Sequence, residues 1–276
     1  MTSVRGGATA VPFFLKNGPG QRFCLYHRPA GACRGAVLYV HPFAEELNRS
    51  RRMAALQARQ LAALGYGVLQ IDLYGCGDSS GDFGDARWDL WKNDLAAGAA
   101  WLQDKLAQPL TMWGLRLGAT LALDYARTAQ EPVRAMVLWQ PVLNASSYLT
   151  QFLRLRMASA LLSDTASANT GTSALRDSLR RGETLEVGGY QLAPEMAAAL
   201  DALESFDSFA PACPVHWMEA TSAAGQGVPA AVARVHAEWQ RQGTELVLHA
   251  MPCPPFWATP EITVCADWLD ATCAAF

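Results

Sequence analysis

The hydrophobic positions of the chain form short, almost wholly apolar runs that alternate with longer stretches of helical spacing. The runs at 36–40, 68–73, 110–113 and 135–139 are apolar at nearly every position, as expected of strands buried on both faces of a sheet. Between them, apolar residues recur at the spacing of a helix with one buried face. This alternation predicts an α/β fold, with a mostly parallel central sheet and helices on both faces.

Local signals set the expected bounds of the other elements. The turn sequence at 17–20 divides an antiparallel hairpin over 13–28. Asn48 is the expected N-cap of the first long helix. The later elements continue the alternation, with helices expected over 86–104, 229–242 and 260–271, and strands over 214–219 and 245–250.

The alternation lapses in the middle of the chain. Between 144 and 205 we expect several helical pieces, no strong strand, and a loop rich in Ser, Thr and Ala around 166–173. An insertion that leaves a sheet and returns to it predicts a helical cap over the carboxyl edge of the strands, where open α/β sheets bind ligands. We therefore expect one domain, with an α/β core of 1–143 and 206–276 and a cap insertion of 144–205.

Composition and charge exclude several classes of function. Hydrophobic residues make up 51% of the chain and charged residues 17%, which suits a large core. The net charge of −3 offers no basic block for a phosphate backbone, so we expect no nucleic-acid partner. Seven cysteines without C-x-x-C pairs indicate reduced thiols, and we expect no cofactor and no metal.

The first twelve residues lack a signal-peptide pattern, and no apolar run approaches the roughly 20 residues of a transmembrane segment. We expect a cytoplasmic protein.

The strongest chemical signal is a strand–Gly-x-x-x-Gly–helix unit at 114–118. It resembles the nucleophile elbow of α/β-hydrolases, a tight turn that presents its middle residue to the substrate. In that fold the middle residue is Ser, Cys or Asp, but here it is Arg116. A guanidinium stays protonated and offers only N–H donors. Loss of the nucleophile removes about a millionfold in rate, so no ordinary acyl-enzyme is expected.

The base and acid of a catalytic triad can be sought separately. The fold places its His in the loop after the last strand, and the corresponding loop, 251–257, contains none. His249, just before that loop, is the one remote candidate for the base; its alternative role is that of a structural strand residue. Glu219 ends the preceding strand at a plausible acid position, but an acid without a base does little.

The oxyanion side of such a site is better preserved. Backbone N–H groups that follow the first buried strand and the nucleophile bind developing negative charge in related enzymes. Because Pro42 has no N–H, the expected donors are Phe43 and Leu117. His41 is either a ligand contact or a hydrogen-bonding residue of the turn.

Two carboxylates follow in the same loop. A charge at the partly buried elbow must be paired to avoid a loss of several kcal/mol. Glu45 or Glu46 is the nearest partner for Arg116 by topology. The alternative is that both belong to a solvated helix start together with Arg51 and Arg52.

Other reactive or aromatic residues have structural explanations. Cys76 and Ser79 lie in a Gly-rich turn, 74–81, and neither has an evident base that would make it a relocated nucleophile. Leu153–Arg156 belongs to the cap and either lines the pocket or faces a membrane surface. Three tryptophans at near-helical spacing are expected in the core: Trp88, Trp91 and Trp101.

Four motifs together resemble one family: His41-Pro42-Phe43-Ala44-Glu45-Glu46, the segment 71–84, Trp113-Gly114-Leu115-Arg116-Leu117-Gly118, and Pro254-Pro255-Phe256-Trp257. They are similar to α/β-hydrolase-superfamily proteins encoded with exosortase A systems, of the second hydrolase type. The resemblance implies a bacterial setting beside exopolysaccharide biosynthesis and protein sorting. A fold does not by itself establish an activity.

Three functions remain open. In the first, Arg116, the N–H groups of Phe43 and Leu117, and the neighbouring side chains of His41 and Glu45 bind a carboxylate or phosphate. In the second, an active hydrolase acts on an ester or related acyl substrate by a non-triad mechanism. There Glu45, Glu46 or His41 is the base and Arg116 the electrophile; a carboxylate beside Arg is expected to have a lowered pKa, which weakens it as a base. In the third, the chain is a protein partner in polysaccharide or export machinery.

Overall fold

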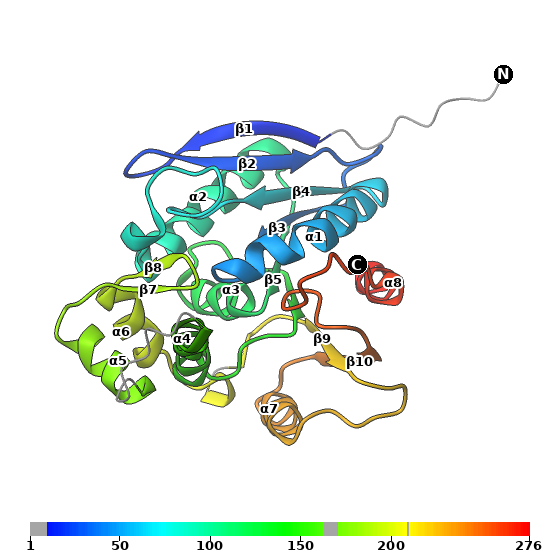
Figure 1. Ribbon diagram of the computed structural model, residues 1–276. Coiled ribbons are helices and arrows are strands. Elements are labelled where there is room, and N and C mark those ends of the chain that lie inside the picture. The colour runs from blue at the N-terminus through cyan, green and yellow to red at the C-terminus, as the bar shows by residue number, and fades with distance from the viewer. Residues whose placement is uncertain (1–9, 163–170, 209) are drawn as a thin grey trace.

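The computed structural model describes residues 10–162, 171–208 and 210–276 (Figure 1). A sheet of eight strands runs through this part of the chain in the order β1-β2-β4-β3-β5-β6-β9-β10. β2 pairs antiparallel with β1 and β4, and every other pairing in the sheet is parallel. The strands are β1 (Ala10–Lys16), β2 (Gln21–His27), β3 (Gly35–Val40), β4 (Tyr66–Ile71), β5 (Leu110–Leu115), β6 (Ala135–Trp139), β9 (Val215–Thr221) and β10 (Leu246–Pro252).

Helices cover both faces of this sheet, which confirms the expected fold class (Figure 1). Alternate residues of β3 show the division, since Leu38 packs in one core and Val37 in the other. The core on the Leu38 side is shared with α2 (Trp88–Leu106), α3 (Leu117–Thr128) and α7 (Ala230–Arg241). The core on the Val37 side is shared with α1 (Glu45–Ala63) and α8 (Ala266–Ala274).

The segment between β6 and β9 forms the group of elements beside α3 in Figure 1. It comprises α4 (Ala145–Leu162), α5 (Thr172–Arg180), β7 (Leu185–Val187), β8 (Tyr190–Leu192), α6 (Pro194–Ala202) and the short 3-10 turn Phe206–Ser208. This segment, in which no strong strand is expected, contains a short hairpin of β7 and β8. Its strands are too short for a hydrophobic alternation to be visible, and Gly188 and Gly189 supply its turn with φ of 58° and 85°. The expected loop at 166–173 lies largely outside the described residues.

Two predicted helix starts are wrong. The first long helix begins at Glu45, directly after Ala44, and Asn48 lies in its first turns as a donor to Glu45 and Tyr190. Ala44 has φ 51°, a tight turn that no propensity rule assigns to alanine. The last helix begins at Ala266 rather than 260, after a loop whose threonine hydroxyls bond to the backbone at 261.

The three tryptophans expected in the core lie there or pack against it. Trp88 and Trp91 are buried, and Trp101 stacks on Phe13 and meets the edge of Tyr26. A further 3-10 turn, Phe83–Asp85, precedes α2 and packs against β8.

Candidate functional site

The turn between β5 and α3 has the geometry of a nucleophile elbow. Arg116 sits at its tip with φ 56° and ψ −124°, a strained conformation for a residue with a side chain. Both flanking glycines are required by close approach. A Cβ on Gly114 would lie 2.5 Å from the Cα of Ala119, and one on Gly118 would lie 2.3 Å from the carbonyl oxygen of His41. The sequence Gly-x-x-x-Gly therefore allows the strand, the turn and the helix to pack this tightly.

The guanidinium of Arg116 is held by groups from four other segments. Its Nε donates to Glu46 Oε1 at 3.3 Å, and one Nη donates to the carbonyl oxygen of Gln140 at 3.4 Å. Its central carbon lies 5.7 Å from the ring centre of Tyr148 on α4 and 5.5 Å from that of Trp257. Trp257 comes from the loop after β10, so an aromatic ring stands over the elbow in the loop where α/β-hydrolases carry their His.

Glu46 is the carboxylate that pairs with Arg116. Burial raises the pKa of its carboxyl, against the opposing effects of Arg116, Tyr148 and Arg49. This corrects the expectation that a carboxylate beside Arg would have a lowered pKa, because desolvation outweighs the neighbouring charge. Glu46 Oε2 is buried and forms no hydrogen bond of ordinary geometry with the described residues, although the neighbouring Tyr148 hydroxyl lowers the pKa of this carboxyl.

Glu45 points elsewhere. Its side chain is half-exposed, lies 3.5 Å from Arg49, and accepts hydrogen bonds from Tyr190 and Asn48. The two neighbouring carboxylates therefore differ. Glu46 fits the proposed partner of the elbow, and Glu45 fits the alternative of a solvated helix start.

The side chain of His41 is fully buried. Its Nδ1 is 2.7 Å from the carbonyl oxygen of Pro42, and its Nε2 accepts the backbone N–H of Leu73 at 3.2 Å. These contacts require the neutral tautomer with the proton on Nδ1. Burial lowers the pKa of the ring, opposed by the charge of Asp72. Both ring nitrogens are occupied by the backbone, which favours the role of a turn residue over a ligand contact.

Glu219 is also buried and fully engaged. It accepts the indole N–H of Trp217 and the side-chain amide of Gln140, both at about 3 Å. Burial raises the pKa of its carboxyl, although these two donors lower it. His249, the remote candidate for a base, instead pairs with His216 on the neighbouring strand at 3.0 Å. No histidine of the described chain hydrogen-bonds to Glu219.

The two expected backbone donors lie on either side of the elbow. Leu117 is the first residue of α3, and Phe43 lies two residues before α1. Within the part of the chain that the structure describes, neither N–H donates to another protein group. The side chain of Phe43 is buried among rings that include Trp91 and Phe152.

These groups surround a cavity of about 310 Å³, which we call the elbow pocket. Its polar lining residues are Arg116, Glu46, Glu45, Arg49 and Gln151, and most of its remaining wall is aromatic or aliphatic. The lining residues are Phe43, Ala44, Glu45, Glu46, Arg49, Arg116, Tyr148, Gln151, Phe152, Leu155, Trp257 and Ala258. A small number of polar groups at one end of an apolar cavity is the usual form of a small-molecule site.

Several of these residues were not predicted. Tyr148, Gln151 and Phe152 come from α4, whose docking onto the elbow has no local sequence signal. Leu155 belongs to the 153–156 stretch and lines the pocket, one of its two expected roles. Trp257 was part of a motif quoted for the family resemblance, but nothing in that motif assigned it a contact with Arg116.

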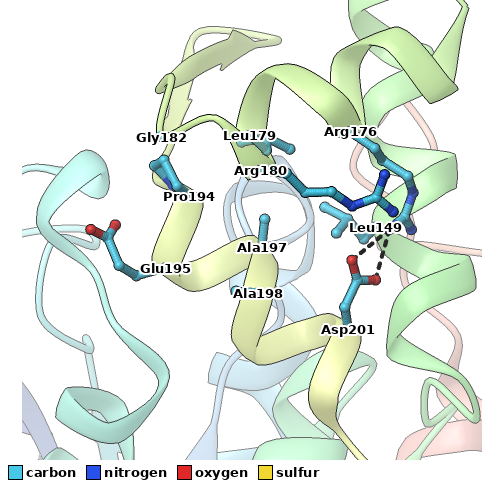
Figure 2. A pocket seen from close by; sticks show the side chains of 10 residues that line it. All are labelled: Leu149, Arg176, Leu179, Arg180, Gly182, Pro194, Glu195, Ala197, Ala198 and Asp201. Carbon is cyan, nitrogen blue, oxygen red and sulfur yellow. Dashed lines mark hydrogen bonds and ion pairs between the residues drawn. The ribbon is translucent and has the colours of Figure 1, made fainter.

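A second cavity, of about 360 Å³, lies between α5 and α6 in the segment that connects β6 to β9 (Figure 2). Arg176 reaches across it to both carboxylate oxygens of Asp201. The same guanidinium donates to the carbonyl oxygen of Ser146 and to the hydroxyl of Thr150 on α4. Both terminal nitrogens of Arg176 thus have protein acceptors, and these bonds fasten α4, the helix that carries Tyr148.

The other reactive side chains are structural. The Ser79 hydroxyl donates to the carbonyl oxygen of Asp72 and accepts the N–H of Phe23, and burial raises the pKa of the Cys76 thiol. The described residues contain no group of three or more His, Cys, Asp or Glu arranged to hold a metal. Within the same residues, no helix has the length and apolarity needed to cross a membrane.

The chain is similar in sequence or in fold to several known proteins. A sequence model of the family described as serine aminopeptidase, S33, matches residues 31–184, more than half of the chain. No curated protein matches the sequence. A soluble variant of monoglyceride lipase from Saccharomyces cerevisiae, in complex with a substrate analogue, has a TM-score of 0.64 at 16% identity, over 100% of this chain and 96% of its own.

Two further solved structures are similar over most of their length. Est1E from Butyrivibrio proteoclasticus, bound to ferulic acid, has a TM-score of 0.61 at 14% identity, over 95% of both chains. A carboxyl esterase from Bacillus coagulans, in complex with glycerol, has a TM-score of 0.59 at 16% identity, over 88% of this chain and 89% of its own. At these identities the likeness is one of fold.

Proposed function

The chain belongs to the serine aminopeptidase S33 family within the α/β-hydrolase superfamily, and from that premise we propose that it binds a small anionic molecule in the elbow pocket instead of forming an acyl-enzyme. The observation that carries the proposal is Arg116 at the tip of an intact elbow. The strained turn and both glycines persist, so the site is built as in a hydrolase, but it presents a fixed cation instead of a nucleophile.

Three features support binding of a carboxylate or phosphate. Arg116 uses two of its five N–H donors on protein acceptors, which leaves others for a ligand. The N–H groups of Phe43 and Leu117 have no acceptor among the described residues, and Leu117 opens a helix whose N-terminus favours negative charge. The aromatic wall of the pocket suits an apolar body attached to the acidic group.

Thermal unfolding in the presence of a ligand panel tests this proposal. We would screen carboxylates, phosphates and acyl esters, and read ester turnover in the same wells. A ligand at a hundred times its Kd stabilises the folded state by about 2.7 kcal/mol. We expect such stabilisation in wild type and in Arg241→Met, which removes an exposed arginine of α7, and its loss in Arg116→Met. The proposal fails if Arg116→Met responds to every anion as wild type does.

A second function is favoured by one observation. Burial raises the pKa of Glu46, which strengthens it as a base beside Arg116. In that case the protein hydrolyses an ester or related acyl substrate by a non-triad mechanism, with Glu46 acting on water and Arg116 as electrophile. Turnover whose pH–rate profile is lost in Glu46→Gln but kept in Glu45→Gln would favour this function over binding alone.

The biological setting is part of the proposal. On the motifs quoted above, we assign the chain to the exosortase A-associated hydrolases of the second type, in the bacterial cytoplasm beside exopolysaccharide biosynthesis. The same setting suggests a protein partner in polysaccharide or export machinery and a cap at 144–205 that covers the ligand. Pull-down with purified components of that machinery tests the partner. Ligand binding in the elbow pocket that stays unchanged when the cap is altered would contradict the role of the cap.

A further inference from the structure

The elbow pocket holds a buried acceptor that the described protein leaves unsatisfied. Glu46 Oε1 accepts Arg116 Nε, but Glu46 Oε2 has no donor. A buried polar atom without a partner costs about 1–3 kcal/mol. Both oxygens belong to a side chain that lines the pocket. A ligand that brings a hydrogen-bond donor to Oε2 would remove this cost.

Besides Glu45 and Arg49, which pair with each other, and the side-chain amide of Gln151, the remaining polar groups around the elbow are donors. They are the unoccupied N–H groups of Arg116 and the backbone N–H groups of Phe43 and Leu117. The head group that satisfies the whole site must therefore accept hydrogen bonds and donate one. A fully ionised carboxylate or phosphate only accepts, and it adds negative charge beside Glu46. A phosphate that keeps one proton can donate, but it still carries a negative charge. A carboxylic acid that carries its proton does both, because its carbonyl oxygen accepts and its O–H donates.

We propose that the ligand is a monocarboxylic acid with an apolar body, bound together with one proton that its carboxyl group shares with Glu46. The inference rests on the proposed function and deepens it by naming the class of ligand. The proton comes from solvent, no covalent bond to the protein forms, and the bound pair of carboxyl groups carries one negative charge opposite Arg116. The apolar body lies against Phe152, Leu155 and Trp257, within a cavity of about 310 Å³.

The groups that face Glu46 are compatible with proton uptake. Arg116 from the elbow, Tyr148 from α4 and Arg49 from α1 each lower the pKa of this carboxyl, yet burial keeps it raised. The neighbouring Glu45 is turned toward Arg49 and Tyr190. The loop after β10 contributes the ring of Trp257 and no charge. A second carboxylate placed beside Glu46 favours the protonated form further, since like charges at close range do not both ionise.

Calorimetric titration with octanoate tests the proposal directly. Measurements at about pH 6 and pH 8, each in two buffers of different ionisation enthalpy, count the protons taken up on binding. We expect one proton per octanoate and an affinity that falls about 100-fold over the two pH units. In Glu46→Gln the side-chain amide donates to ionised octanoate, so proton uptake should vanish and the affinity should become flat with pH. Glu131→Gln, which changes an exposed carboxylate in the loop between α3 and β6, is the control and should behave as wild type does.

Two further probes separate the proton from the charge. Octanesulfonate is ionised throughout and cannot share a proton, so it should bind far more weakly than octanoate at pH 6. Octanamide is neutral and offers both an acceptor and donors, so it should bind without proton uptake at either pH. Octanoate binding without proton uptake, or octanesulfonate binding as tightly as octanoate, would overturn the inference. The inference would also be overturned if octanoate did not bind while another anion did. If no anion bound, the proposed function itself would be overturned.

Discussion

Replacement of Arg116 by methionine should destabilise the protein by leaving Glu46 without its cationic partner. Methionine keeps much of the length of the side chain and removes its charge. It also carries a Cβ, so the strain of the turn at φ 56° is unchanged by the substitution. The expected loss therefore comes from the ion pair, the bond to Gln140 and the contacts with the two rings.

The magnitude follows from the burial of the pair. Removal of one partner of a fully buried pair costs about 3–5 kcal/mol, whereas an exposed pair contributes about 0–1 kcal/mol. The side chains of Arg116 and Glu46 are 17% and 18% exposed, so solvent screens them in part. We expect about 2 kcal/mol from the pair, and about 0.5–1 kcal/mol more from the lost cation–π contacts with Tyr148 and Trp257.

The loss of stability in Arg116→Met should depend on pH. The pKa of Glu46 is already raised in the folded protein, and loss of Arg116, which lowers it, raises it further. A carboxyl with a raised pKa binds more protons in the folded state than in the unfolded state. Its stabilising contribution is present below the unfolded-state pKa and is lost as pH rises through the folded-state pKa. The deficit of Arg116→Met should therefore be largest near pH 8 and shrink as pH falls toward 5.

Urea unfolding followed by tryptophan fluorescence measures the deficit. Glu46→Gln in the Arg116→Met background removes the stranded charge, so the double variant should be more stable at pH 8 than Arg116→Met alone. Equal stability of Arg116→Met and wild type at pH 8, or a deficit that does not change with pH, would refute the assignment of a buried pair at the elbow.

Three other outcomes are expected. Gly118→Ala should prevent folding or lower the free energy of unfolding by several kcal/mol, because the added Cβ would lie 2.3 Å from a backbone oxygen. In the control, Gly227→Ala, the added Cβ meets nothing within 4 Å, and the melting temperature should be unchanged. Arg22→Met should cost about 3–5 kcal/mol in urea unfolding, since Arg22 and Asp94 form a 2.7 Å pair with side chains 1% and 0% exposed; substitution of Asp94 by Asn as well should recover part of the loss. Arg116→Ser should give no burst of acyl-enzyme with activated esters, because the loop after β10 offers no histidine, and a burst would show that a base was overlooked.

The buried strands and the elbow were predictable because their signals are local. A strand such as β3 is apolar at every position, and it is buried at every position. Gly114 and Gly118 mark the elbow because only glycine permits the contacts found there. By contrast, the start of α1 depends on Ala44 at φ 51°, which is imposed by the packing of the β3–α1 turn and not by the preferences of alanine.

The site was predictable only in part. The order of the strands predicted that the carboxylates after β3 lie near Arg116. Which carboxylate pairs with Arg116, Glu46 or Glu45, depends on the rotation of α1 about its axis. The raised pKa of Glu46 comes from burial, which outweighs the lowering effects of Arg116, Tyr148 and Arg49, and the sequence does not specify how α4, the helix of Tyr148, docks. Trp257 could be placed near the elbow from its loop, but its position over the guanidinium required the structure.

The most direct test of the central claim is a paired titration and turnover measurement on wild type and Arg116→Met, both checked for native circular dichroism. Octanoate is titrated calorimetrically at about pH 6, and hydrolysis of an octanoyl ester is followed on the same samples. We predict saturable octanoate binding to wild type, at least about tenfold weaker binding to Arg116→Met, a loss of about 1.4 kcal/mol, and no turnover by either protein. Ester turnover by wild type that Arg116→Met lacks would contradict the account and establish an enzyme.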